Sequence, residues 1–149
     1  MDIIFVRHGE PDYDIIHQRK WPVSMVCLAP LSAAGVKQTE NAAQNSQLPN
    51  ADIVVSSPYT RALQTASIIS RIGGADKTFR IRTEPEFLFA LRSFRENKDK
   101  KEHKISWELR AEIKKRVTSS LQRYRDFKKI IVVAHEEVIR SIKGSTDHI

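Results

Sequence analysis

The stretch that decides the fold is MDIIFVRHGE, residues 1–10. Residues 3–6, Ile-Ile-Phe-Val, form the short apolar run that is typical of a buried strand. Arg7 and His8 follow this run directly. They can be interpreted as charged residues of a solvated turn, or as functional groups at the carboxyl end of a strand, where open α/β sheets bind their ligands. The rest of the sequence has to decide between the two.

Size and composition predict one soluble domain, residues 1–149, that is large enough to bury a core. Hydrophobic residues make up 40% and charged residues 29%, which excludes a disordered chain. The single cysteine, Cys27, cannot form an internal disulfide. We find no secretory signal and no apolar run near the ~20 residues of a membrane span. We therefore expect a cytoplasmic protein with no membrane partner.

The net charge of +7 is concentrated in residues 92–129, which hold fourteen Lys or Arg and six Asp or Glu. A basic segment can bind nucleic acid or an anionic substrate. Here the two signs of charge are mixed, which favours a solvated helix face. The segment also lacks the interleaved aromatic residues that stack on single-stranded nucleic acid. We therefore do not expect a nucleic-acid partner.

Four segments have the pattern of strands: Asp2–Val6, Asp52–Ser56, Thr78–Thr83 and Ile130–Ala134. The first, second and fourth are continuous apolar runs, as in parallel strands that are covered on both faces. Because helical patterns fall between the strands, the sequence predicts a three-layer α/β/α fold with a mostly parallel sheet.

The helices are expected at positions marked by capping residues and apolar spacing. One runs from Ser32 toward Gln47, one from Ser57-Pro58 to Gly73-Gly74, one from near Ser106 with an apolar stripe of Leu109, Ile113, Val117, Leu121 and Tyr124, and one follows His135. Two long stretches, Asp14–Pro30 and Glu84–Ile105, are expected to be irregular.

Polar residues gather where three of the predicted strands end. Arg7 and His8 follow the first strand, Arg61 lies in the first turn of the helix after the second, and His135 follows the fourth. The carboxyl ends of parallel strands share one edge of the sheet, so these side chains should meet there. Two arginines, two histidines and nearby helix N-termini suit a phosphate group. We expect a phosphate or sulfate ion to bind at this edge.

Three motifs resemble those of the histidine phosphatase superfamily, which has the phosphoglycerate-mutase-like fold. They are V-R-H-G-E at residues 6–10, S-S-P-Y-T-R-A-L-Q-T-A at 56–66 and V-V-A-H-E-E-V-I-R at 132–140. L-S-A-A-G-V-K-Q-T-E, residues 31–40, is similar to the helix that the family places between the first two blocks. The matches follow the family order along nearly the whole chain.

The resemblance implies that His8 is a nucleophile that attacks phosphorus and becomes phosphohistidine. It also implies that Arg7, Arg61 and His135 bind the phosphoryl oxygens, and that no metal or other cofactor takes part. A zinc-protease motif is excluded by the residues themselves, because Ile139 stands where H-E-x-x-H needs its second histidine.

The first departure from the family pattern concerns the position of the general acid. The usual register places Phe89 at that position, and Glu84 and Glu86 are the nearby carboxylates that could replace the acid or simply lie on the surface. General acid catalysis is worth ~10²–10⁴ in rate, so alkyl phosphates would suffer most from its loss. Aryl phosphates and phosphohistidine would suffer least.

Two acidic residues and the chain end also depart from the family pattern. Asp14 stands where relatives have Asn, and it is expected to turn away from a phosphate. Glu136 replaces the glycine after the second histidine. A glutamate there suits the dipole of the following helix but brings negative charge near the phosphate site, and its backbone N–H can still serve if the side chain faces solvent. Residues 144–149 end where relatives begin a further strand, so we expect that final strand to be absent. The open sheet edge would then allow an oligomer.

The sequence therefore favours a metal-independent phosphatase that acts on a phosphorylated small molecule or phosphoprotein through phospho-His8. Two alternatives stay open. One is a phosphate-binding relative with little turnover and a regulatory role, which the departures favour. The other is a mutase-type phosphotransferase, which the shortness of the chain disfavours.

Overall fold

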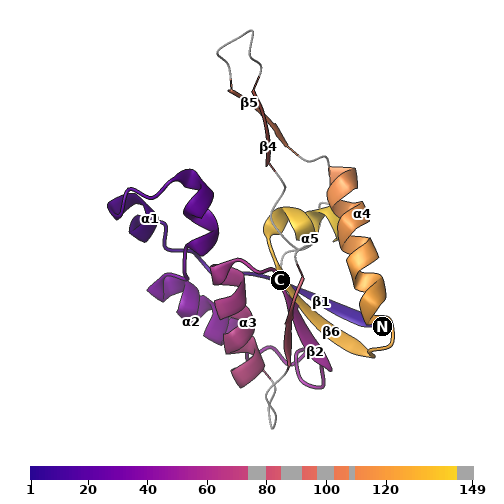
Figure 1. Cartoon of the computed structure of the whole chain (residues 1–149). Coiled ribbons are helices and arrows are strands. Elements are labelled where there is room, and N and C mark those ends of the chain that lie inside the picture. Colours follow the sequence, from indigo (N-terminus) through magenta and orange to yellow (C-terminus); the bar gives the residue numbers. More distant parts are fainter. Residues whose placement is uncertain (74–79, 85–91, 97–102, 108–109, 144–149) are drawn as a thin grey trace.

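The computed structural model describes residues 1–73, 80–84, 92–96, 103–107 and 110–143 (Figure 1). Its main sheet has four parallel strands in the order β1-β6-β2-β3. Their bounds are Asp2–Arg7 for β1, Lys129–Ala134 for β6, Ile53–Ser56 for β2 and Ile81–Thr83 for β3. The mostly parallel sheet predicted from the apolar runs is confirmed.

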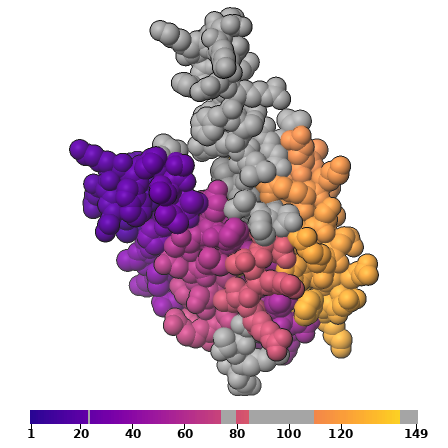
Figure 2. Space-filling model, in the orientation of Figure 1, coloured from indigo at the N-terminus to yellow at the C-terminus, as the bar shows by residue number. Residues whose placement is uncertain are grey.

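Helices cover both faces of this sheet. Their bounds are Asp14–Gln18 for α1, Ala33–Ala42 for α2, Thr60–Ile72 for α3, Arg110–Leu121 for α4 and Glu136–Lys143 for α5. Short 3₁₀ helices, η1 and η3, span Val23–Leu28 and Gln122–Tyr124. Figure 2 shows the segment that holds α1 and η1 bulging from the side of the molecule opposite α4 and α5.

Each strand divides its side chains between two cores, because alternate residues point to opposite faces. Val132 of β6 packs with Val117 of α4 and Val138 of α5. Val133, the next residue, packs with Ala66 of α3 on the other face. The sheet therefore lies between two helical layers, and the three-layer prediction is confirmed.

The predicted helix start near Ser106 is wrong. Residues His103–Trp107 form strand β5, which pairs in antiparallel fashion with β4, Arg92–Glu96. Helix α4 begins at Arg110, after this pair. The sequence His-Lys-Ile-Ser-Trp alternates polar with β-branched or aromatic residues, which is a strand pattern that the longer helical stripe obscured. The prediction of an irregular stretch over Glu84–Ile105 missed this hairpin.

Other boundaries also differ from the predictions. The stretch Asp14–Pro30 contains α1 and η1, and α2 ends at Ala42, before Gln47. Helix α3 begins at Thr60, two residues after Pro58. No helix in the described part of the chain is long and apolar enough to cross a membrane. The expectation for residues 144–149 lies outside the described residues.

Candidate active site

The carboxyl ends of β1, β2 and β6 bring the predicted residues together. The N–H of His8 donates to the carbonyl of Ala134 at 3.1 Å, and that of Ser57 donates to the carbonyl of Val133 at 2.9 Å. These bonds continue the parallel ladders by one residue beyond the strands. As a result, the rings of His8 and His135 lie edge to face with centroids 5.0 Å apart.

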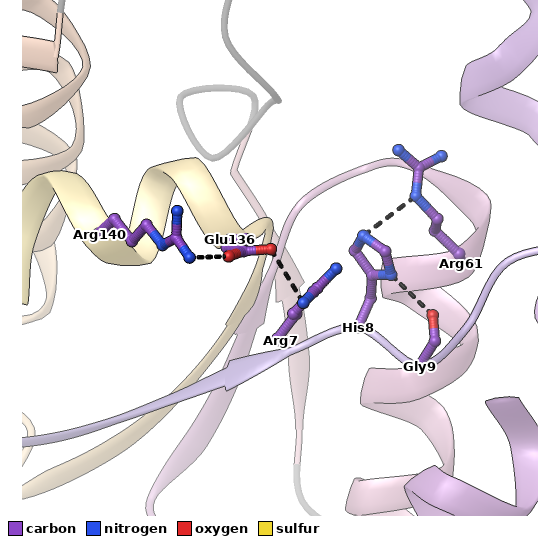
Figure 3. A network of polar contacts seen from close by, with 6 residues as sticks. All are labelled: Arg7, His8, Gly9, Arg61, Glu136 and Arg140. Atoms are coloured by element: carbon purple, nitrogen blue, oxygen red, sulfur yellow. Dashed lines mark hydrogen bonds and ion pairs between the residues drawn. The ribbon is translucent and has the colours of Figure 1, made fainter. Parts of the chain in front are cut away.

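The ring of His8 is held in one tautomer. Its Nδ1–H donates to the carbonyl oxygen of Gly9 at 2.7 Å, and its Nε2 accepts from Nε–H of Arg61 at 3.2 Å (Figure 3). The pKa of His8 is lowered from 6.5 to about 4, chiefly by burial and also by the charges of Arg61 and Arg7, against the opposing effect of the Gly9 bond. The imidazole is therefore neutral at pH 7, with the Nε2 lone pair aimed at a guanidinium group.

Arg61 is a buried cation, only 3% exposed, in the first turn of α3. Its Nη1 donates to the carbonyl of Val26 in η1 at 3.1 Å. Its guanidinium also lies 4.9 Å from the ring of Tyr59 and 6.0 Å from that of Tyr13. Burial lowers the pKa of Arg61, but the group stays charged. A buried cation with aromatic neighbours is a strong attractor for an anion.

His135 is fully buried at the end of β6. Its Nε2 is 2.9 Å from the hydroxyl oxygen of Ser57, and the ring of Tyr59 lies against it with centroids 4.9 Å apart. Burial, followed by the electrostatic influence of His8 and Arg61, lowers the pKa of His135 to about 2. His135 is therefore a neutral residue beside His8, suited to donate a hydrogen bond to an anion without adding charge.

The loop after His8 is fixed by helices α2 and α3. The N–H of Gly9 donates to the hydroxyl of Thr65, which itself donates to the carbonyl of Arg61. A Cβ on Gly9 would lie 2.5 Å from the carbonyl oxygen of Gly35. A Cβ on Gly35 would lie 2.1 Å from the carbonyl oxygen of Glu10, so neither glycine tolerates a side chain. Close packing of the loop after β1 against α2 and α3 thus sets the position of His8.

The site opens into a cavity of about 340 Å³. Its described lining residues come from the β1 loop, α3 and the start of α5: Arg7, His8, Pro11, Tyr13, Arg61, His135, Glu136, Glu137 and Arg140. The four residues predicted to bind phosphate are all among them. In the described part of the chain, no three histidine, cysteine or carboxylate side chains lie close enough together to hold a metal ion.

The cavity holds the neutral His8 together with Arg7, at the end of β1, and Arg61, in the first turn of α3. This arrangement agrees with the sequence comparison. The model of the histidine phosphatase superfamily, branch 1, matches residues 3–88, which is more than half of the chain. The chain belongs to the histidine phosphatase superfamily. A search of curated proteins found no match.

Solved structures of other histidine phosphatases share the fold. A protein of Escherichia coli K-12, provisionally assigned as an alpha-ribazole-5′-P phosphatase, has a TM-score of 0.66 and 19% identity over 95% of this chain and 77% of its own. The protein histidine phosphatase SixA, complexed with tungstate, has a TM-score of 0.66 and 16% identity over 100% of this chain and 81% of its own. A mycobacterial glucosyl-3-phosphoglycerate phosphatase has a TM-score of 0.61 and 17% identity over 94% and 76%.

The structure gives Glu84 a partner on the α4 side of the sheet. Its carboxylate is largely buried and accepts hydrogen bonds from the hydroxyl of Tyr124 and from Nη2 of Arg123, the latter at 2.8 Å. Burial and this contact raise the pKa of the Tyr124 hydroxyl. Glu84 is not among the described residues that line the cavity. Glu86 and Phe89 lie outside the described residues.

Glu136 brings a negative charge to the site, as its position in the sequence indicates. Its carboxylate lines the cavity and forms ion pairs with Nη1 of Arg7 at 2.9 Å and with Nη2 of Arg140 (Figure 3). The reason is that Glu136 begins α5 beside Arg7, while Arg140 lies one turn further on the same helix face. The i,i+4 spacing of Glu136 and Arg140 was the available sequence signal. Asp14, in contrast, is exposed at the start of α1 and is not among the described lining residues.

Proposed function

We propose that this histidine phosphatase hydrolyses phosphomonoesters or phosphohistidine, without a metal, through a phosphohistidine intermediate on His8. The observation that carries the proposal is the fixed tautomer of His8, whose Nε2 lone pair stands beside the buried cation Arg61 in the cavity. A neutral imidazole whose other nitrogen is held by a hydrogen bond is an activated nucleophile. Its low pKa keeps it in this form at neutral pH.

In the first step, the Nε2 lone pair of His8 forms a bond to phosphorus. The bond from phosphorus to the leaving oxygen or nitrogen breaks, and the leaving group keeps that electron pair and takes a proton from solvent. Arg61 must give up its hydrogen bond to Nε2 as the attack begins, and its N–H groups then serve the phosphoryl oxygens. Arg7 and His135 donate to the same oxygens, which offsets the charge of the transition state.

In the second step, a water oxygen bonds to phosphorus and the phosphorus–nitrogen bond breaks. Its electron pair returns to Nε2 of His8, one proton of the water passes to solvent, and inorganic phosphate leaves. Because Glu84 is engaged with Tyr124 and Arg123, the proposal assigns no general acid. The substrates that suit this site are therefore those whose leaving group needs little protonation, such as aryl phosphates and phosphohistidine.

The test is hydrolysis of p-nitrophenyl phosphate in the presence of a chelator, with wild type and His8→Ala. The proposal expects turnover that His8→Ala abolishes, and inhibition by tungstate, which binds the related SixA. A matched control is His17→Ala, an exposed histidine on α1, which should keep full activity. Turnover that survives in His8→Ala would refute the nucleophile. A folded wild type that binds tungstate but shows no turnover would favour the regulatory alternative.

A further inference from the structure

The cavity is larger than the phosphoryl site and has an outer wall of its own. Once Arg7, His8, Arg61 and His135 are assigned to the phosphoryl group, the described lining residues that remain are Pro11, Tyr13, Glu136, Glu137 and Arg140. Attack from His8 requires the leaving group to lie opposite Nε2, in line with the new bond. The leaving group must therefore point away from His8 and pass this outer wall.

The outer wall is acidic. Glu136 and Glu137 contribute two negative charges from the first turn of α5, and Arg140 contributes one positive charge. Arg140 is already held by Glu136, so its guanidinium is not available to a substrate carboxylate without breaking that ion pair. Among the described lining residues, the net charge that faces the leaving group is thus negative.

The same carboxylate also acts on the phosphoryl side of the cavity. Glu136 accepts from Nη1 of Arg7, whose side chain is 55% exposed, and so fixes one edge of that guanidinium (Figure 3). A substrate with a second anionic group would have to compete with Glu136 for Arg7 or for Arg140. A neutral or cationic leaving group meets no such competition.

We propose that Glu136 determines specificity, so that the site selects phosphoryl groups carried by neutral or cationic leaving groups and rejects leaving groups that bear a carboxylate. This inference rests on the proposed function for the position of the leaving group. It excludes phosphoglycerate-like acids as good substrates. It favours phosphoryl groups on imidazole, on amines, or on side chains with basic neighbours. The Tyr13 ring, which lines the same wall, suits a planar carrier.

The test uses two non-hydrolysable probes of similar size that carry opposite charges at the para position, 4-(aminomethyl)benzylphosphonate and 4-carboxybenzylphosphonate. Their dissociation constants are measured by calorimetry for wild type, Glu136→Gln, Glu137→Gln and Glu40→Gln, the last a control on α2 away from the cavity. One charge near a screened protein surface changes affinity on the order of fivefold. Because the probes differ by two charges, wild type should bind the amine about 20-fold more tightly.

Glu136→Gln should reduce this preference at least fivefold, chiefly by improving the binding of the carboxylate probe, since Arg7 and Arg140 are then released. Glu137→Gln should reduce it less, and Glu40→Gln should not change it. Equal affinity of the two probes for wild type, or a preference that Glu136→Gln leaves unchanged, would overturn the inference. Hydrolysis of p-nitrophenyl phosphate is measured in parallel. A preference for the amine probe without turnover would refute the phosphatase activity alone. Turnover without that preference would refute the role of Glu136 in specificity alone.

Discussion

The free energy of unfolding should fall between pH 7 and pH 5, and replacing His8 with glutamine should make this fall smaller by about 2 kcal/mol. Burial lowers the pKa of His8 to about 4, whereas the unfolded chain has the ordinary value of 6.5. The unfolded state therefore binds the proton more readily, so this contribution to stability is present above pH 6.5 and is lost as the pH falls toward 4. At pH 5 the unfolded imidazole is charged and the folded one is neutral. At ~1.4 kcal/mol per pH unit, the 1.5 units between 6.5 and 5 give about 2 kcal/mol.

The assay is urea unfolding, followed by circular dichroism, at pH 7 and pH 5. The free energy of unfolding of wild type should fall by about 2 kcal/mol more than that of His8→Gln between these pH values. His135 stays neutral in the fold of both proteins at these pH values, so its contribution largely cancels in the difference. His17→Gln, at an exposed position on α1, serves as the matched control and should behave like wild type.

Equal losses in wild type and His8→Gln would refute the reasoning, because they would mean that His8 takes up a proton as easily in the fold as outside it. The same pKa has a kinetic consequence. If His8 is the nucleophile, kcat/KM, once corrected for protonation of the substrate's own phosphate, should stay level from pH 8 down to about pH 5, since the imidazole of the free enzyme is still neutral there. A fall of the corrected kcat/KM below pH 6.5 would contradict the buried environment described for this ring.

Two further substitutions separate residues that affect catalysis from residues that only stabilise the fold. Thr65→Val removes the acceptor of the Gly9 N–H, which is a buried donor. It should lower the free energy of unfolding by about 1–3 kcal/mol and lower kcat more than it raises KM. An unchanged kcat would show that this bond does not position His8. Glu84→Gln should cost about 1–2 kcal/mol, because it weakens two hydrogen bonds on the α4 side, and should leave the hydrolysis of both aryl and alkyl phosphates unchanged. A loss of 100-fold or more with alkyl phosphates alone would identify Glu84 as the general acid.

The central fold could be predicted from the sequence because three of its four strands are short, continuous apolar runs. Such runs fit only a sheet that is covered on both faces, and the right-handed connection rule then leaves few arrangements. Once the strands are parallel, the meeting of Arg7, His8 and His135 at one edge follows from their places at strand ends. The proximity of these three residues could therefore be predicted without knowing any single side-chain contact.

The remaining features could not be predicted because they depend on which partner a polar side chain finds. Ser57 is a typical capping residue, but α3 begins only at Thr60, and the Ser57 hydroxyl contacts His135 as well as the N–H of Tyr59. Glu84 could be read as a catalytic or as a surface carboxylate. The structure instead buries it against Tyr124, which lies 40 positions away in the sequence. Contacts of this kind are set by tertiary packing and leave no local pattern.

The contacts that hold His8 are independent of Glu136, which bears on how the specificity experiment is to be interpreted. The ring of His8 is fixed by the Gly9 carbonyl and by Arg61, and Gly9 is fixed by Thr65. None of these contacts involves the Glu136 carboxylate, whose ion pairs are with Arg7 and Arg140. Glu136→Gln should therefore change the charge of the cavity without moving the nucleophile. A shift in probe preference while the free energy of unfolding stays close to that of wild type would separate an electrostatic effect from a structural one.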